Sequence, residues 1–300
     1  MDASSGGSDA VEGREWLAAL PTELVVQRDL LTQLVDLCVA TPRASSLSVG
    51  CSLGRGAGDA LSDVDVALGV DTARGDPGAD LVMSVERAVV AAVCDGDFVV
   101  DVLRDQVGPP NRCIRRVFAQ FCNGLQLDLA IMAETEVRRG PAAPDFVPLY
   151  GSSAPAEARN GTDSPEVARF PSADTVTPDQ IYEWTFLGWC ALADVDKYLH
   201  RRSLWEAHNR LHEARGRVWA LWAAANSATY PWHGLSQVLD QDPQLLPPGI
   251  EATVARLEHA DLHRAAHATA ETLAQVSRLA AGKHHAPLPM NMADHVISRL

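Results

Sequence analysis

The spacing of apolar residues changes near residue 178, and this change constrains the fold more than any other feature of the chain. Before it, short apolar runs alternate with polar residues or end at glycines, as strands do. After Thr177, which suits a helix cap, and Pro178, which suits a first helical turn, the apolar spacing is helical almost to the end. The sequence therefore predicts an α+β half followed by an all-helical C-terminal bundle.

The α+β half is expected to form a mixed sheet flanked by helices. Helical spacing covers residues 21–39 and 80–94, and strand-like runs cover residues 46–51, 64–68 and 97–103. Two more apolar runs follow and are joined by Asn123-Gly124, a dipeptide that favours the turn of a β-hairpin.

Residues 141–178 are rich in Pro, Ser, Ala and Gly, and this composition is typical of a connector. One short strand is expected inside it, at residues 147–150. In the helical half, candidate helices cover residues 179–200, 203–225 and 249–280.

The charge of the chain argues against two classes of partner. Its 300 residues include 25 Lys and Arg against 39 Asp and Glu, a net charge of -14. Nucleic acids and anionic membrane surfaces select basic faces, so we expect neither as a partner. No apolar run reaches the roughly 20 residues of a membrane helix, the start is polar and acidic, and the cysteines form no CxxC pair. We therefore expect a cytoplasmic protein.

Residues 46–70 hold the residues that suit chemistry best. A strand runs into Gly50-Cys51-Ser52, where a glycine allows close approach to the backbone and a serine can cap a helix. Free backbone amides at such a turn bind phosphate oxygens, aided by the Ser52 hydroxyl. Arg55 follows in the same loop and is a further candidate for a phosphate contact.

Asp63 and Asp65 stand on one face of the next predicted strand, about 7 Å apart. A divalent metal ion fits between two such carboxylates. An Asp-x-Asp pair is also typical of a solvated strand face, so the pair gains meaning only together with the turn that precedes it.

A strand, a Gly-x-Ser turn, about ten residues and then Asp-x-Asp between aliphatic residues resembles the nucleotidyltransferases related to DNA polymerase beta. The stretch FAQFCNGLQLDLAIMAETE is also similar to the hairpin of aminoglycoside 6-adenylyltransferases, the streptomycin adenylyltransferase type. The resemblance implies a nucleotidyltransferase-like sheet and a helical second domain that closes over the active site.

The resemblance also implies a third carboxylate between apolar residues on a neighbouring strand. Asp128 and Asp101 both qualify, and the family pattern favours Asp128. With Asp63 and Asp65, this residue would hold two Mg²⁺ ions. ATP would then be the nucleotide substrate, with Gly50, Ser52 and Arg55 as its phosphate-binding residues.

One basic stretch stands out in the helical half. Residues 197–217 carry six Lys and Arg side chains and only two Glu. A bundle helix facing the active site would use such cations on a triphosphate, and Lys197 is our choice for that contact. A solvated helix face with paired charges is the alternative.

The expected organisation joins these segments. It is a disordered tail over residues 1–18, a nucleotidyltransferase catalytic domain over 19–140, a connector over 141–178, a helical domain over 179–285, and a tail over 286–300. The implied activity is Mg²⁺-dependent transfer of AMP from ATP to a hydroxyl of a small molecule such as an aminoglycoside, with release of pyrophosphate. That activity would confer antibiotic resistance. A protein-modifying, toxin-like nucleotidyltransferase and an inactive nucleotide-binding regulator are the alternatives.

Overall fold

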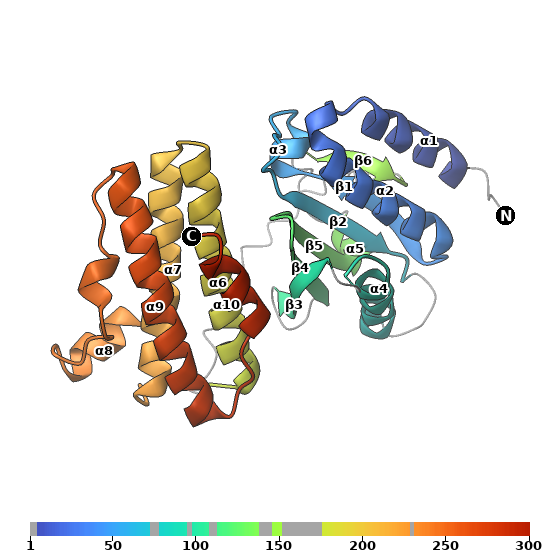
Figure 1. The fold of residues 1–300 in the computed structure, drawn as a ribbon. Helices are drawn as coiled ribbons and strands as arrows, with labels where there is room; N and C mark the ends of the chain where they lie inside the picture. Colours follow the sequence, from blue (N-terminus) through green and yellow to red (C-terminus); the bar gives the residue numbers. More distant parts are fainter. Residues whose placement is uncertain are drawn as a thin grey trace, which may run out of the picture. The chain divides into compact units, whose positions relative to one another are not determined.

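The structure is a computed structural model that describes residues 5–72, 78–94, 98–107, 113–137, 146–151, 176–228 and 231–300. It divides into two compact units, Met1–Ala168 and Arg169–Leu300. The first contains a sheet with helices and the second is helical (Figure 1). The expected α+β fold with an all-helical C-terminal part is therefore confirmed.

The sheet of the first unit has six strands in the order β3-β4-β5-β2-β1-β6. Strands β2 and β5 run parallel, and every other neighbouring pair is antiparallel. The sheet is thus mixed, as expected. The strands are β1 (Ala44–Val49), β2 (Val64–Val70), β3 (Val99–Val107), β4 (Ile114–Phe121), β5 (Gln126–Ala133) and β6 (Val147–Tyr150).

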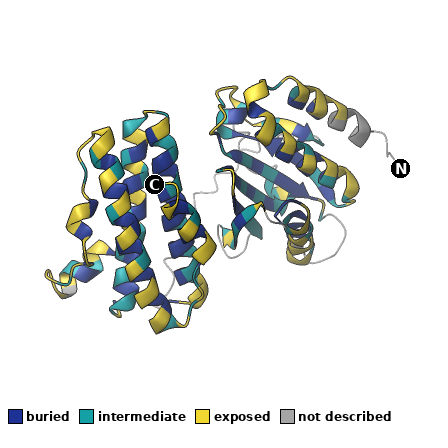
Figure 2. Ribbon diagram, in the orientation of Figure 1, coloured by how far each residue is buried: buried dark blue, intermediate teal, exposed yellow. Residues whose placement is uncertain are grey.

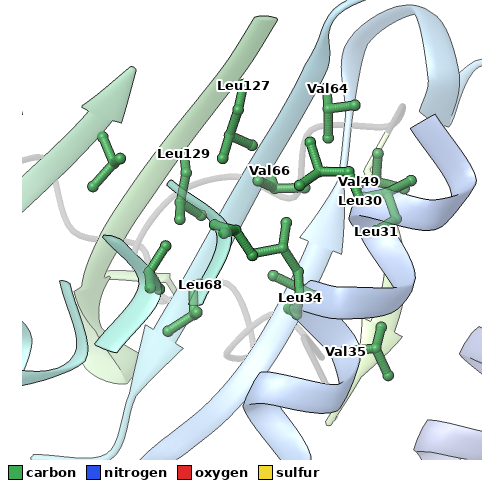
Figure 3. Close-up of a cluster of buried hydrophobic side chains, with 14 of the residues drawn as sticks. Leu30, Leu31, Leu34, Val35, Val49, Val64, Val66, Leu68, Leu127 and Leu129 are labelled. Carbon is green, nitrogen blue, oxygen red and sulfur yellow. The ribbon is translucent and has the colours of Figure 1, made fainter. Parts of the chain in front are cut away.

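Helices pack on one face of this sheet because alternate strand residues are apolar. The short 3-10 helix η1 (Thr22–Leu24) leads into helix α2 (Val25–Ala40). Leu31 and Leu34 of α2 belong to the same buried cluster as Val66 and Leu127 of the sheet (Figure 3). Helix α4 (Gly78–Val93) contacts the same sheet through β2, β4 and β5. Figure 2 shows the buried side of α2 turned toward the sheet.

The hairpin predicted from Asn123-Gly124 joins β4 to β5. Gly124 has a φ of 93°, in the region that favours glycine, and its amide donates to the Phe121 carbonyl at 3.0 Å. The Asn123 side chain accepts from the Leu125 amide at 3.0 Å. Hydrogen bonds within the turn therefore satisfy the backbone amides of Gly124 and Leu125.

Two expectations about the first unit need correction. Residues 1–18 were expected to be a disordered tail, but α1 (Ser5–Ala18) is a helix whose Leu17 is 3% exposed. It packs on α2 and on β6, an edge strand of the sheet (Figure 1). The sheet therefore extends past residue 140 into the expected connector, whose residues 152–175 lie outside the described part of the chain.

The first helix of the second unit begins at the N-cap predicted from Thr177. Thr177 accepts from the Gln180 amide at 3.2 Å, and the Gln180 side chain accepts in return from the Thr177 amide at 2.9 Å. This reciprocal pair is a capping box. The helices that follow are α6 (Pro178–His200), α7 (Leu204–Ala225), η2 (Pro231–His233), α8 (Leu235–Gln241), η3 (Ile250–Thr253), α9 (His259–His284) and α10 (Met290–Ile297).

The last two predicted segments differ from the structure. The helix expected over residues 249–280 begins as η3, and α9 starts only at His259. The tail expected over residues 286–300 contains α10, whose Met292 and Val296 are 0% and 1% exposed and which packs on α6 and α9. Of the helices in the described residues, none combines the length and apolar character needed to cross a membrane.

Candidate carboxylate site on the sheet

Asp65 of β2 and Asp128 of β5 are direct partners in the parallel strand register. Neighbouring strands lie about 4.8 Å apart, so the two backbone positions are adjacent. Val64, Val66, Leu127 and Leu129 flank them and are buried toward α2 and α4. Because side chains alternate along a strand, Asp65 and Asp128 stand on the opposite face of the sheet. The register thus brings together two residues that are far apart in sequence.

Asp63 precedes the first residue of β2, at the end of a short turn over residues 59–62. Within the turn, the Ser62 amide donates to the Asp59 carbonyl and the Asp59 amide donates to the Ser62 hydroxyl, both at 2.9 Å. The turn is also held from outside by Gln27 of α2, which is 1% exposed and donates to the Ser62 carbonyl at 2.9 Å.

Sequence reasoning missed Gln27. The same side-chain amide lies 3.2 Å from the Ala60 carbonyl and 3.4 Å from the Asp59 carbonyl. The available signal was its position on the apolar face of the helix, three residues after Leu24 and four before Leu31. A polar residue in such a stripe is buried and needs partners.

The turn after β1 lies beside Asp65. The Gly50 amide donates to the Asp65 carbonyl at 2.9 Å, and the short helix α3 (Cys51–Gly54) follows directly. A Cβ on Gly50 would lie 2.6 Å from the Phe146 ring, so the ring packs on the bare glycine. Ser52 lies in α3 and is partly exposed, whereas Arg55 caps the C-terminal end of α3 and is exposed.

Cys51 follows Gly50 in the turn and begins α3. It is partly exposed, and its φ is 54°, in the left-handed region. That region costs a residue with a Cβ about 1–2 kcal/mol.

Arg116 of β4 holds Asp128. Its Nε donates to Asp128 Oδ1 at 2.8 Å and its Nη2 donates to Oδ2 at 2.5 Å, so both carboxylate oxygens are engaged. The Arg116 and Asp128 side chains are 27% and 32% exposed. The guanidinium also lies over the Phe118 ring, 5.1 Å from its centroid. Sequence reasoning missed this partner as well.

Asp101, the other candidate for the third carboxylate, lies on β3. It pairs with Gln120 of β4, and β4 separates β3 from β5 in the sheet. Its Oδ1 accepts from the neighbouring Val102 amide at 2.9 Å. The register therefore puts Asp128, and not Asp101, beside Asp65.

Lys197 lies in α6 of the second unit. Its Nζ is 2.7 Å from Asp194 Oδ1, and the two side chains are 11% and 10% exposed. Arg210 of α7 approaches the other oxygen of Asp194 at 3.3 Å, and this carboxylate raises the pKa of Arg210 against the opposing effect of burial. Two residues of the basic stretch are therefore paired inside the helical unit.

The donor chemistry at the sheet fits a hard divalent cation. Asp63, Asp65 and Asp128 offer carboxylate oxygens, the ligands that Mg²⁺ and Mn²⁺ prefer. Across the described residues, no three His, Cys, Asp or Glu side chains are already arranged around one metal position. At Asp128, Arg116 engages both carboxylate oxygens.

The fold and this site define an α+β protein with paired carboxylates on one face of a mixed sheet. The sequence matches no protein-family model and no curated protein. Among solved structures, the chain is similar to an aminoglycoside 6-adenyltransferase from Bacillus subtilis, with 11% identity and a TM-score of 0.34 over 93% of this chain and 98% of the other. This is a distant structural similarity.

Proposed function

We propose that the protein is a divalent-metal-dependent nucleotidyltransferase. The observation that carries the proposal is the register of β2 and β5, which pairs Asp65 with Asp128 and leaves Asp63 two residues away at the entrance to β2. The Gly50 turn, bonded to the backbone of Asp65, supports the same function because it offers a place for phosphate groups beside the carboxylates.

In this proposal each residue has a defined task. Asp63, Asp65 and Asp128 would hold Mg²⁺, which when bound would neutralise the triphosphate and polarise its α-phosphate. Ser52 and the backbone around Gly50 would bind the β- and γ-phosphates through the amides that follow Gly50, and Arg55, exposed at the end of α3, would add a charge-assisted hydrogen bond. Lys197 stays our candidate for a further phosphate contact, which would require it to share or break its ion pair with Asp194.

The reaction we propose is transfer of a nucleoside monophosphate, AMP from ATP, to a hydroxyl of a small molecule. The acceptor oxygen forms a bond to the α-phosphorus while the bond from that phosphorus to the bridging oxygen breaks, and pyrophosphate leaves. Asp128 would orient the hydroxyl and take its proton. A polycationic acceptor such as an aminoglycoside suits a protein with a net charge of -14.

The test measures where the α-phosphate of ATP is transferred. Purified protein is incubated with α-labelled ATP and Mg²⁺, with aminoglycosides, with lincosamides and with cell lysate in separate reactions. We expect label on a small molecule. Label on a protein band would instead support the protein-modifying alternative, and no transfer to any acceptor would support a nucleotide-binding regulator.

The control is the Asp63→Asn/Asp65→Asn double variant, which keeps the shape of both side chains and removes both charges. We expect it to transfer no label. A variant that consumes nucleotide at the parent rate would overturn the assignment of the site, whatever acceptor the parent uses.

A further inference from the structure

Arg116 forms an ion pair with Asp128, one of the proposed metal ligands. On β4 it is paired with Ala130, while Phe118 is paired with Asp128, so its side chain runs diagonally along the sheet to the carboxylate. The contact is bidentate, the geometry in which a guanidinium binds a carboxylate best. A cation that binds both oxygens of Asp128, or that takes a lone pair used by Arg116, has to break at least one of these two hydrogen bonds.

Glu86 and two arginines form a buried ion-pair cluster on the other face of the sheet, and it serves for comparison. Glu86 of α4 is 0% exposed and accepts from Arg115 and Arg104, which lie on the helix-covered face. The Arg116–Asp128 pair lies on the opposite face and is about one-third exposed. This pair is more exposed than Glu86, so we expect its loss to cost less stability than the loss of Glu86.

Three acidic residues are grouped at this position. Arg116 supplies one positive charge, while Asp65 and Asp128 are adjacent on neighbouring strands and Asp63 lies two residues from Asp65. A divalent cation compensates more of this charge than a guanidinium does. Arg116 also keeps a second contact, the face of Phe118, that does not depend on Asp128. If Arg116 releases the Asp128 carboxylate, its guanidinium therefore keeps the contact with the Phe118 ring.

We propose that Arg116 and a divalent cation compete for the Asp128 carboxylate, so that Arg116 sets the cation concentration at which the site fills. The inference rests on the function proposed above. Arg116 is in this sense a positioning residue. It holds Asp128 in place beside Asp65, and it gives up the carboxylate to the metal.

The test measures binding of Mn²⁺ to the full chain in the absence of nucleotide, by titration calorimetry or by the spectrum of free Mn²⁺. We expect Arg116→Gln to lower the Kd for Mn²⁺ by roughly tenfold, in line with the loss of a charge-assisted pair. Arg116→Lys keeps the charge but not the bidentate contact and should lower the Kd less. It also serves as the test if Arg116→Gln does not fold.

Two controls separate competition from a general change of charge. Arg104→Gln removes one positive charge from the other face of the same sheet and leaves Glu86 paired with Arg115, so it should not change the Kd. In an Asp128→Asn background, Arg116→Gln should have no further effect, because the two substitutions remove the same interaction.

The outcomes distinguish the two proposals. If the parent binds Mn²⁺ and both Arg116 variants bind it equally or more weakly, the competition is refuted while the metal site stands. If the parent and the Arg116 variants all fail to bind Mn²⁺ at millimolar concentration, the proposed function is refuted and the competition with it. Tighter binding by both Arg116 variants, absent from Arg104→Gln and abolished by Asp128→Asn, supports the inference.

Discussion

Gln27 donates a hydrogen bond to the Ser62 carbonyl across 35 positions of sequence, from a helix to the turn that delivers Asp63. The side chain is 1% exposed, so this bond forms out of water. The position of the first candidate carboxylate therefore depends on α2, a helix that carries none of the proposed catalytic residues.

Gln27→Met should loosen this turn. The change leaves the Ser62 carbonyl without its side-chain donor, and we expect a loss of about 1–3 kcal/mol in the free energy of unfolding together with a clear fall in nucleotidyl transfer. Urea unfolding and transfer assays measure the two effects. Thr32→Val is the matched control, since Thr32 donates only within α2, to the Arg28 carbonyl at 2.7 Å. Equal behaviour of the two variants would contradict the role of Gln27.

Asp128→Asn and Asp101→Asn separate the two candidates for the third carboxylate. Asp128 is the register partner of Asp65, whereas Asp101 pairs with Gln120 on the far side of β4. We expect Asp128→Asn to reduce the transfer rate by about a hundredfold or more, as for loss of a catalytic base or metal ligand. Asp101→Asn should keep the parent rate. The reverse ranking would move the third role to Asp101.

The stability of the protein should fall in acid through Glu86. Burial acts to raise the pKa of Glu86, but the hydrogen bonds from Arg115 and Arg104 outweigh it, and the pKa lies below the ordinary value of 4.5. A lowered pKa in the folded state stabilises the protein above pH 4.5, and this contribution is lost as the pH falls below that value.

Glu86→Gln tests this directly through melting temperatures measured between pH 3 and pH 7. At neutral pH the variant should lose about 3 kcal/mol of stability, because two arginines lose their buried partner. Its melting temperature should depend less on pH in the acid range than that of the parent. Parallel pH profiles for parent and variant would show that Glu86 does not contribute to acid sensitivity.

Cys51→Gly should stabilise the first unit. The φ of 54° at Cys51 is unfavourable for a residue with a Cβ, and glycine removes that cost. After the greater flexibility of glycine in the unfolded chain is subtracted, we expect a gain of roughly 0.5–1 kcal/mol. Thermal unfolding measures it. Cys122→Gly, at an exposed cysteine without a positive φ, should not stabilise.

Ser277→Ala should stabilise the helical unit. Ser277 of α9 is 2% exposed, and its hydroxyl has no hydrogen-bond partner among the described residues. It lines a small pocket of about 120 Å³ between α6, α9 and α10. Removal of an unsatisfied buried hydroxyl avoids a penalty of about 1 kcal/mol. Thr269→Val is the control, because Thr269 donates to the Ala265 carbonyl at 2.7 Å and its loss should destabilise.

The local features of the fold could be predicted from the sequence because they depend on neighbouring residues. Asn123-Gly124 predicted the hairpin between β4 and β5, and Thr177 with Pro178 predicted the start of α6. The helical second half also followed from apolar spacing, whereas the mixed sheet was expected from the resemblance to nucleotidyltransferases. For the hairpin and the start of α6, the signal and the structure lie within a few residues of each other.

Other features depend on partners that are distant in sequence. Helices α1 and α10 are short terminal segments, and they are stabilised by apolar residues such as Leu17 and Met292 that pack on the rest of their unit. The parallel neighbours β2 and β5 bring Asp65 to Asp128, and no local pattern specifies that register. Arg116 reads as an ordinary strand residue until the register places it diagonally to Asp128.

The parallel pairing of β2 with β5 also determines when the carboxylates can meet during synthesis. Strand β2 ends at Val70 and β5 begins at Gln126, so α4, β3 and β4 have to be made first. Non-local strand pairings of this kind form slowly, because a long loop closes before any contact compensates for it. A nascent chain that ends before Gln126 contains Asp63 and Asp65 but lacks the strand that completes the group. We therefore expect the pairing of Asp65 with Asp128 to form late in folding.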